Sequence, residues 1–419
     1  MITAVLVGLG HRGVGYATYA DSHPDELQIV GVAEPDPVRR ERYAERFGVS
    51  PENCFENAED LAAAKRFADV AINGTMDEIH VETTVPLLEA GYDVLLEKPI
   101  APDEKQLKIL EDAVIRTGQT VVICHVLRYA PFYTAIKQRV DDGEIGDIMH
   151  IHTTENVSYH HMAVAFIRGK WNREETNPML LAKCCHDLDL ICWMKSGIQP
   201  KKVASFGGRH FFTVDNAPEG SALRCADCSI ERECEYSAIR HHVDNGMWPF
   251  YALAGESNYE RGVEAEEEVI RAYVADSDYG RCVWHCDNDV VDRQSVIVEF
   301  EDGCVATHDM VTNSAKGTRR IQITGTKGDI YGDMMDGKFT ISKPGAVAGS
   351  EAVVEEIQIG LLGDLHGGGD LRLVADFLSV VRGDGGSIST TALSDSINSH
   401  LIAYAADVAM REERVVTID

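Results

Sequence analysis

The stretch that decides the fold is Thr3–Gly13, with the sequence TAVLVGLGHRG. Its first five residues form a nearly continuous apolar run, which is typical of a parallel β-strand buried on both faces. The run leads into a G-x-G-x-x-G loop, Gly8-Leu9-Gly10-His11-Arg12-Gly13. Such a loop makes a tight turn, lets the backbone approach a pyrophosphate and directs N–H groups of the next helix at the phosphates. The segment therefore predicts the start of a dinucleotide-binding domain.

A second apolar run strengthens this interpretation. Residues 28–33 are followed by Glu34, about 20 residues after Gly13, where a carboxylate can accept hydrogen bonds from both ribose hydroxyls. A carboxylate there also repels a 2′-phosphate, so we expect NAD rather than NADP as cofactor. The alternative is a glycine turn next to an unrelated surface acid, and the order of strand, turn, helix, strand and acid argues against it.

The alternation of strands and helices continues to about residue 125. Strands are expected at 69–73, 93–96 and 120–124, with helices at 78–89 and 103–117. This pattern predicts a doubly wound parallel sheet whose ligands lie at the carboxyl ends of the strands. The residues that follow those strands are therefore candidates for contacts with the cofactor or substrate: Thr75, His80, Glu97, Lys98, His125 and Arg128.

Lys98 is the most informative of these residues. An ammonium group at the mouth of a dinucleotide site can bind a substrate hydroxyl and, if it is desolvated beside NAD⁺, can take part in proton transfer. Pro99 would fix the turn that orients it. The alternative is a solvated lysine before a turn proline, and the position directly after a buried strand favours the catalytic interpretation.

Residues 179–194 read MLLAKCCHDLDLICWM and carry a second set of candidates. In a helix, Lys183, His186 and Asp187 lie within one turn. A histidine with an ordinary pKa of about 6.5 can accept a hydroxyl proton near neutrality, so His186 is the preferred general base. Lys183 and Lys98 would together bind or polarise the substrate oxygen. A purely structural histidine is the alternative.

Composition limits the remaining functions. The chain has 419 residues, enough for two domains, and a formal charge of −29, which disfavours nucleic acid and anionic membranes as partners. No segment reaches the ~20 apolar residues that span a bilayer, and the first residues do not resemble a signal peptide. We therefore expect a cytoplasmic protein with mostly reduced, buried cysteines.

One cysteine cluster stands apart from the other thiols. Cys225, Cys228 and Cys234 have the spacing C-x2-C-x5-C, and they could hold a tetrahedral zinc ion with one further ligand. That ligand could come from His241, His242, Cys282 or Cys286. The alternatives are reduced structural thiols, an iron–sulfur cluster or a redox disulfide.

These motifs together resemble the Gfo/Idh/MocA family, which includes glucose-fructose oxidoreductase and inositol dehydrogenases. The resemblance rests on the glycine loop, Glu34, Glu97-Lys98-Pro99 and the His125…Arg128…Pro131 stretch. It also rests on three later motifs: Gly143-Glu144-Ile145-Gly146, His186-x-x-Asp189-x-x-x-Trp193 and Gly367-Gly368-Gly369-Asp370. One departure is that the family commonly has a carboxylate four residues before this histidine, and here that position is Ala182.

The resemblance implies a fold and an activity. We expect an NAD-binding Rossmann domain at residues 1–125 and an α+β domain at 126–419 with a large, mostly antiparallel open sheet and a cysteine-containing insertion at about 212–290. Strand-like runs at 150–154, 203–206, 295–300, 305–310, 319–324, 338–342 and 353–359 are compatible with that sheet. The implied assembly is a homodimer or homotetramer.

The expected function is hydride transfer between nicotinamide and a secondary alcohol or ketone of a sugar or cyclitol. Candidate substrate contacts are His125, Arg128, Asp187 and, in the stretch ENVSYHHMAVAFIRGKW, Glu155, His161, Arg168 and Trp171, each of which could instead serve folding alone. Two other functions stay open. One is a redox-assisted glycosidase or epimerase with tightly bound, regenerated NAD, and the other is a non-catalytic NAD-binding sensor.

Overall fold

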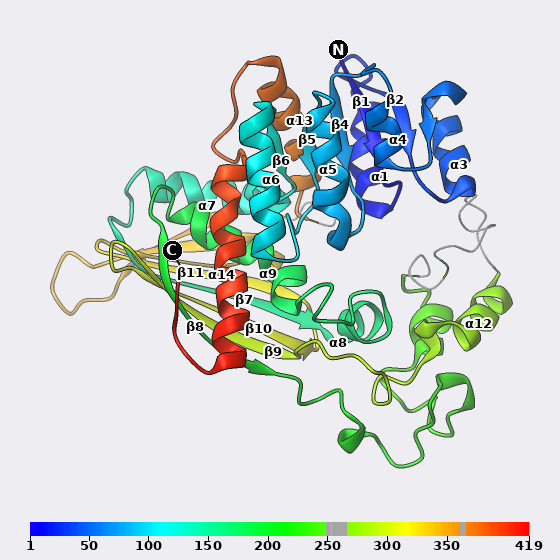
Figure 1. The fold of residues 1–419 in the computed structure, drawn as a ribbon. Helices are drawn as coiled ribbons and strands as arrows, with labels where there is room; N and C mark the ends of the chain where they lie inside the picture. Colours follow the sequence, from blue (N-terminus) through cyan, green and yellow to red (C-terminus); the bar gives the residue numbers. More distant parts are fainter. Residues whose placement is uncertain (249–252, 254–265, 361–365, 419) are drawn as a thin grey trace.

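The protein is built on two sheets that lie one above the other, with helices packed between and around them (Figure 1). The structure is a computed structural model, and it describes residues 1–248, 253, 266–360 and 366–418. The first 125 residues form the upper, blue-to-cyan part of Figure 1, and a wide sheet formed by later residues lies beneath it. The predicted site residues come from both parts, so they have to meet where these parts face each other.

The upper sheet has six strands, all parallel, in the order β3-β2-β1-β4-β5-β6. This is the order of a dinucleotide-binding fold, and it confirms the predicted doubly wound sheet. The strands are β1 Ile2–Val7, β2 Leu27–Ala33, β3 Cys54–Phe55, β4 Val70–Asn73, β5 Asp93–Leu96 and β6 Val121–Ile123. The helices around it are α1 His11–Ala17, α2 Tyr19–Ser22, α3 Pro37–Phe47, α4 Ala58–Ala63, α5 His80–Glu89 and α6 Glu104–Thr117.

Two helices near the C-terminus complete the upper part. Helix α13 (Gly369–Arg382) places Leu373 and Phe377 in the same apolar cluster as Leu6 of β1 and Tyr16 of α1. Helix α14 (Leu393–Glu412) packs against α6 above and against α9 and β8 below (Figure 1). The end of the chain therefore holds the two sheets together.

The lower sheet has nine strands in the order β14-β13-β12-β11-β7-β10-β9-β8-β15. Only the β7–β10 pair is parallel, so the expected large, mostly antiparallel sheet is confirmed. The strands are β7 Ile148–Ser158, β8 Pro200–Gly208, β9 Arg293–Phe300, β10 Val305–Ser314, β11 Thr318–Gly325, β12 Asp329–Asp333, β13 Lys338–Lys343, β14 Val353–Gln358 and β15 Val416–Thr417. Strand β12 was not predicted, because five residues that include Gly332 give a weak alternation.

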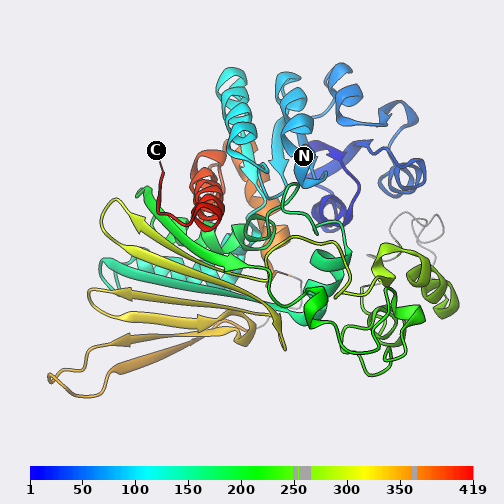
Figure 2. The same cartoon turned by 60° about the horizontal axis from the view of Figure 1, so that its bottom comes forward.

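The lower sheet is covered on one face only. Along β9, buried and exposed residues alternate, which is typical of a sheet with one solvated face. Helices α7 (Pro131–Asp141), α9 (Met179–Met194) and α14 cover the other face, as Figure 2 shows from below. Every residue of α9 except Lys183 is buried, so its histidine and aspartates need partners inside the protein.

A separate lobe lies between β8 and β9, where the insertion was predicted. It consists of short turns and the helix α12 (Glu267–Asp276), and it stands to one side of the sheet in Figures 1 and 2. In the part of the chain that the structure describes, no helix has the length and apolar character to cross a membrane.

Candidate active site

The glycine loop packs directly on the end of β4. Gly8 has a φ of +78°, and a Cβ atom there would lie 2.8 Å from the backbone nitrogen of Thr75. A Cβ at Gly13 would lie 2.5 Å from the carbonyl oxygen of Gly8. Neither position accepts a larger residue without movement of the backbone, so the first and third glycines are required for this close packing.

Glu34 lies beside this loop at the end of β2. Its buried carboxylate accepts hydrogen bonds from the backbone N–H of Leu9 at 2.8 Å and of Asp36 at 3.1 Å, and Arg39 approaches it at 3.3 Å. The loop and the acid are therefore held together by the protein's own hydrogen bonds. The prediction that they form one site agrees with this geometry.

Thr75 and His80 belong to the loop that follows β4. The Thr75 hydroxyl donates to the Asn73 side chain at 2.8 Å. The fully buried His80 has Nδ1 2.6 Å from the carbonyl oxygen of Pro99 and Nε2 3.2 Å from that of Thr75. His80 thus connects the loops after β4 and β5, including the cis Lys98–Pro99 bond, and its ring nitrogens are engaged by the backbone.

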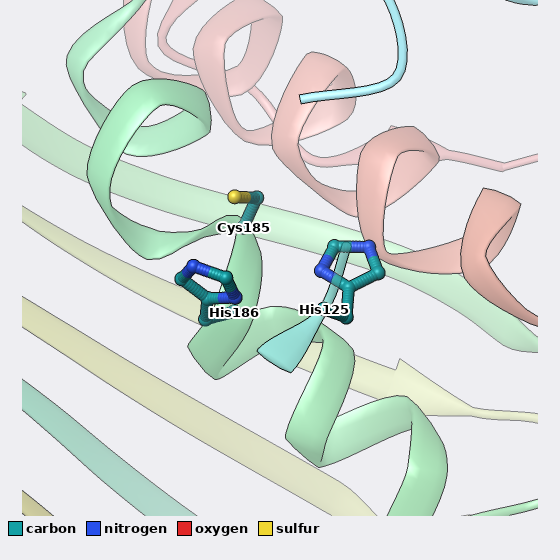
Figure 3. Close-up of side chains that lie close together, drawn as sticks. All are labelled: His125, Cys185 and His186. Carbon is teal, nitrogen blue, oxygen red and sulfur yellow. The ribbon is translucent and has the colours of Figure 1, made fainter. Parts of the chain in front are cut away.

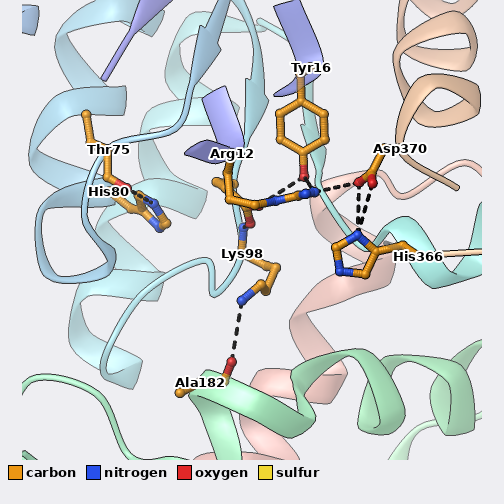
Figure 4. A network of polar contacts seen from close by, with 9 residues as sticks. Arg12, Tyr16, Thr75, His80, Lys98, Ala182, His366 and Asp370 are labelled. Carbon is orange, nitrogen blue, oxygen red and sulfur yellow. Dashed lines mark hydrogen bonds and ion pairs between the residues drawn. The ribbon is translucent and has the colours of Figure 1, made fainter. Parts of the chain in front are cut away.

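A buried ionic network begins at Glu97, directly after β5 (Figure 4). Its carboxylate accepts from Arg12 Nε at 2.8 Å and from the Tyr16 hydroxyl at 2.9 Å, and it also accepts from the Lys98 backbone N–H. Arg12 Nη2 also bonds Asp370 at 2.6 Å. Burial raises the pKa of Glu97, but Arg12 and Lys98 outweigh that effect and keep its pKa below the ordinary value. Arg12 belongs to the glycine loop, as its sequence position requires, and its guanidinium is bound by Glu97 and Asp370.

Lys98 points from this network down to helix α9 (Figure 4), where its Nζ donates to the carbonyl oxygen of Ala182 at 3.4 Å. Burial lowers its pKa, but nearby groups, Cys185 and Glu97 first among them, outweigh this and raise it above the usual value. Lys98 is therefore a charged hydrogen-bond donor, and this differs from the low pKa considered for it from the sequence, because Cys185 and Glu97 favour its charged form.

His186 lies one helical turn beyond Ala182, next to His125 and Cys185 (Figure 3). The ligand atoms of these three residues lie within 4.8 Å of one another, and the two imidazole rings are 5.8 Å apart. Burial, followed by the charge of Lys98, keeps the pKa of His186 well below 6.5, and the pKa of His125 is also well below that value through burial and Arg128. Burial raises the pKa of Cys185 to about 12. The cluster is uncharged at neutral pH.

His186 Nδ1 and both ring nitrogens of His125 are buried without a hydrogen-bond partner in the structure. An unpaired buried polar atom is costly, so atoms of this kind indicate a site that accepts a ligand. Lys98 contacts α9 at Ala182, one helical turn before His186, and its charge lowers the pKa of that imidazole.

A residue that the sequence analysis missed, Arg319 of β11, organises the charges beside this site. Its guanidinium bonds Glu155 at 2.6 Å and Asp187 at 2.7 Å, and Glu155 in turn contacts Lys183 Nζ at 3.1 Å. Burial raises the pKa of Asp187, while Arg319 opposes that shift. Arg319 therefore pairs with both carboxylates, and Lys183 pairs directly with one of them, Glu155.

Arg128 is engaged elsewhere in the interior. It forms a two-pronged ion pair with Asp189 at 2.6 and 2.7 Å and donates to the carbonyl oxygen of Thr390 at 3.2 Å. Both partners of the ion pair are buried. The guanidinium therefore joins α9 to the segment before α14, and its hydrogen-bonding capacity is used within the protein.

The remaining predicted substrate residues lie along one stretch after β7. His161 is half-buried, and burial followed by the charge of Lys183 keeps its pKa well below 6.5. Trp171 donates from its indole nitrogen to Asp77 at 3.0 Å. Arg168, the last residue of the helical turn Met162–Arg168, faces the lobe and donates to the carbonyl oxygens of Arg281 and Tyr236, both at 2.6 Å. The structure thus brings His161 near Lys183 and places Arg168 away from Lys98 and His186.

Comparison with known proteins gives matches over most of the chain. Residues 2–125 match the GFO/IDH/MocA oxidoreductase family with an NAD-binding Rossmann fold, and residues 133–223 match the GFO/IDH/MocA C-terminal domain. The putative oxidoreductase YteT of Bacillus subtilis is 24% identical over 311 residues, which cover 72% of this chain and 69% of that protein. Inositol 2-dehydrogenase of Corynebacterium glutamicum strain R is 26% identical, over 45% of this chain and 52% of its own length.

Solved structures share the fold over the whole chain. A levoglucosan dehydrogenase in complex with NADH superimposes with a TM-score of 0.72 at 16% identity, covering 100% of this chain and 99% of that one. An NAD-binding protein from Listeria innocua superimposes with a TM-score of 0.65 at 17% identity, covering 100% and 99%.

The geometry around Glu34 generates the first prediction. Replacing Glu34 with alanine removes a charged acceptor of the ribose hydroxyls, worth about 1.5–3 kcal/mol, so NADH should bind at least about tenfold more weakly. NADPH affinity should rise relative to NADH, because Arg39 then faces the 2′-position without a competing carboxylate. Titration calorimetry with both coenzymes measures the ratio, and Glu41→Ala, an exposed acid on α3, is the control. An unchanged NADH-to-NADPH ratio would contradict the assignment.

Proposed function

Because the chain belongs to the GFO/IDH/MocA family of NAD-binding oxidoreductases, we propose that it interconverts a secondary alcohol and a ketone of a sugar, sugar derivative or cyclitol. The observation that supports this most is the position of Lys98, whose ammonium bonds to Ala182 one turn before His186 on α9 and whose charge lowers the pKa of that histidine. One is a charged donor and the other a neutral base, and together they suit an oxygen that changes between hydroxyl and carbonyl.

The cofactor site fits NAD by its own geometry. Gly8 and Gly13 leave no room for a Cβ beside the end of β4, and the acid at the end of β2 is already aligned with the loop. The residues that would hold the cofactor are Gly8, Leu9, Gly10, His11, Gly13, Glu34 and Thr75, with Arg12, His80 and Glu97 fixing the loops around them. When bound, NAD supplies the hydride acceptor in oxidation and the hydride donor in reduction.

The protein supplies the proton chemistry. In the oxidation direction, the substrate hydroxyl donates its proton to the unprotonated ring nitrogen of His186 while the Lys98 ammonium hydrogen-bonds to the same oxygen. The low pKa of His186 keeps the ring ready to accept that proton at neutral pH. In reduction, the imidazolium returns the proton to the forming alkoxide. Glu97 and its network hold Lys98 in position throughout.

The substrate class follows from the polar groups beside these two residues. His161, Lys183 and the carboxylates paired with Arg319 offer donors and acceptors that suit several hydroxyl groups on one small ring. The names of the inositol and levoglucosan dehydrogenases among the similar proteins point to the same class. We propose that the substrate is surrounded by further side chains: His125, Asp187, Glu155 and Trp171. Arg128 supports them indirectly, through its ion pair with Asp189 of α9.

The function is tested with NAD⁺ and a panel of free and phosphorylated sugars and inositols. Stoichiometric NADH formation supports a dehydrogenase, whereas product formation without net NADH would indicate a redox-assisted glycosidase or epimerase. With the best substrate, Lys98→Met should lower kcat by roughly 100-fold or more and leave NAD affinity nearly intact. Lys105→Met, an exposed lysine on α6, is the matched control. Near wild-type turnover of Lys98→Met would refute the catalytic role.

The pKa of His186 sets the pH dependence of oxidation. A base is active when unprotonated, and burial and the charge of Lys98 put the His186 pKa well below 6.5. A bound, positively charged nicotinamide lowers it further. We therefore expect kcat/KM for the alcohol, at saturating NAD⁺, to stay constant from about pH 8 down to pH 6.5 and to fall only at more acidic pH. An acidic limb with its midpoint at 6.5 or above would show that another group is the base.

We also propose a homodimer or homotetramer formed through the open face of the lower sheet. That face exposes apolar side chains on neighbouring strands, including Phe206, Ile297 and Val311. Exposed apolar side chains on a sheet face are typical of an interface, even where polar residues such as Ser295 and Asp309 lie between them.

Sedimentation analysis tests the assembly. At micromolar concentration the wild-type protein should sediment as a dimer or tetramer, and Ile297→Glu should shift it toward the monomer, because the new charges would be buried in the interface. Ile115→Glu, on the exposed side of α6, should leave the mass unchanged. A monomeric wild-type protein, or an Ile297→Glu variant that assembles normally, would contradict the proposal.

All eleven cysteines are free thiols in the structure, which agrees with a reducing compartment, and we propose the cytoplasm. Cys225, Cys228 and Cys234, considered from the sequence as ligands of a structural zinc ion, are not among the groups of described residues whose ligand atoms lie within 4.8 Å of one another.

A further inference from the structure

His366 carries an acid–base group that the proton chemistry above does not use. It lies just before α13, and its Nδ1 is 3.2 and 3.0 Å from the two carboxylate oxygens of Asp370, four residues later (Figure 4). Its imidazole ring also lies next to that of His186, with 6.1 Å between the ring centres. One histidine therefore contacts a carboxylate on one side and approaches the proposed base on the other.

The glycine turn before α13 brings His366 to this position. Gly367 and Gly368 have φ angles of +61° and +88°, in the left-handed region that favours glycine, and they turn the chain into the helix. A Cβ atom at Gly369 would lie 2.2 Å from the carbonyl oxygen of Val126. The start of α13 therefore packs tightly on the segment that follows β6, and a larger residue there would displace His366.

The Asp370 carboxylate decides which nitrogen of His366 carries a proton. Burial raises the pKa of Asp370, but the hydrogen bond from His366 and the charge of Arg12 outweigh it and keep that pKa below its ordinary value. A carboxylate only accepts hydrogen bonds, so His366 Nδ1 donates, and Nε2 is the nitrogen that can gain or lose a proton. A carboxylate in this position also stabilises the imidazolium form of the ring.

His186 needs a partner of this kind, because its own surroundings do not supply protons. Burial and the charge of Lys98 keep the pKa of His186 well below 6.5, so the ring is unprotonated at neutral pH. Only 5% of the residue is exposed, and its Nδ1 has no hydrogen-bond partner. In ketone reduction, His186 can give a proton to the forming alkoxide only after it has received one from another group.

His366 has the access to solvent that His186 lacks, because 29% of its side chain is exposed. The titratable and charged groups that face it are Asp370 on α13, His186 on α9, His11 on α1 and, through Asp370, Arg12. Two imidazoles at this separation can exchange a proton through one water molecule. His366 is therefore placed to exchange protons both with His186 and with solvent.

Building on the proposed dehydrogenase function, we infer that His366 carries protons between His186 and solvent, and that Asp370 holds its ring in position. In oxidation, the N–H bond formed on His186 breaks, a proton passes through one water molecule to His366 Nε2, and the His366 imidazolium then releases a proton to solvent. In reduction, the same steps run in the opposite direction. No electrons move in these steps, because the hydride passes between substrate and nicotinamide.

Chemical rescue tests this role with NADH and the ketone product of the best substrate in the panel. His366→Ala should lower kcat for reduction by at least about tenfold near neutral pH, because His186 loses its proton supply. Added imidazole should restore turnover in proportion to its concentration, since it can replace the missing ring as proton carrier. A purely structural defect would not respond in this way. His23→Ala, which removes an exposed histidine before β2, is the control.

His366→Asn separates proton transfer from packing. The asparagine amide can still donate to Asp370 but cannot gain or lose a proton, so NADH affinity and the thermal unfolding midpoint should stay near wild-type values while kcat falls. Near wild-type turnover of His366→Ala, or a loss that imidazole does not restore, would overturn the role of His366. Wild-type protein that forms no NADH with any member of the panel would instead contradict the dehydrogenase function itself.

Discussion

The arrangement of the active site depends on the buried carboxylate of Glu97. It accepts hydrogen bonds from Arg12, from Tyr16 and from the backbone of Lys98, and Arg12 extends the network to Asp370 at the start of α13. A buried carboxylate is tolerated only when its charge is compensated, so these segments are held in one relative position. The glycine loop, the end of β5 and a helix more than 270 residues later are joined in this way. The same network positions Lys98, because the Lys98 backbone N–H donates to the Glu97 carboxylate.

Helix α9, which Lys98 contacts at Ala182, is also held in place by buried charges that must be compensated. Its two aspartates are buried, and each is paired with an arginine: Asp189 with Arg128, and Asp187 with Arg319. Because these pairs fix the rotation of the helix, His186 faces the end of β6 and the Lys98 side chain. The neutral His125–Cys185–His186 cluster then lies next to a positive charge, which favours the unprotonated imidazole that the proposed proton transfer needs.

The parts predicted from sequence were those encoded in local patterns. Thr3–Gly13 and Glu34 place strand, loop and acid by spacing alone, and the parallel sheet followed from alternating apolar runs. Arg319 was not assigned its role, because it meets Glu155 and Asp187 only through the long-range pairing of β7 with β11. Arg128 and Arg168 were read as substrate residues for a related reason, since a guanidinium in sequence does not reveal which buried group it compensates. The adjacent pair Arg319-Arg320 interrupts the alternation of polar and apolar residues in this strand, and it was the one signal that could have marked Arg319.

The most direct test of this account is a crystal structure of the protein with NADH and a non-reacting polyol or ketone analogue of its substrate. The account predicts one ligand oxygen within hydrogen-bonding distance of both Lys98 Nζ and a ring nitrogen of His186, on the nicotinamide side of α9. A complex in which the two side chains contact different ligand atoms, or in which either one turns away from the ligand, would contradict it.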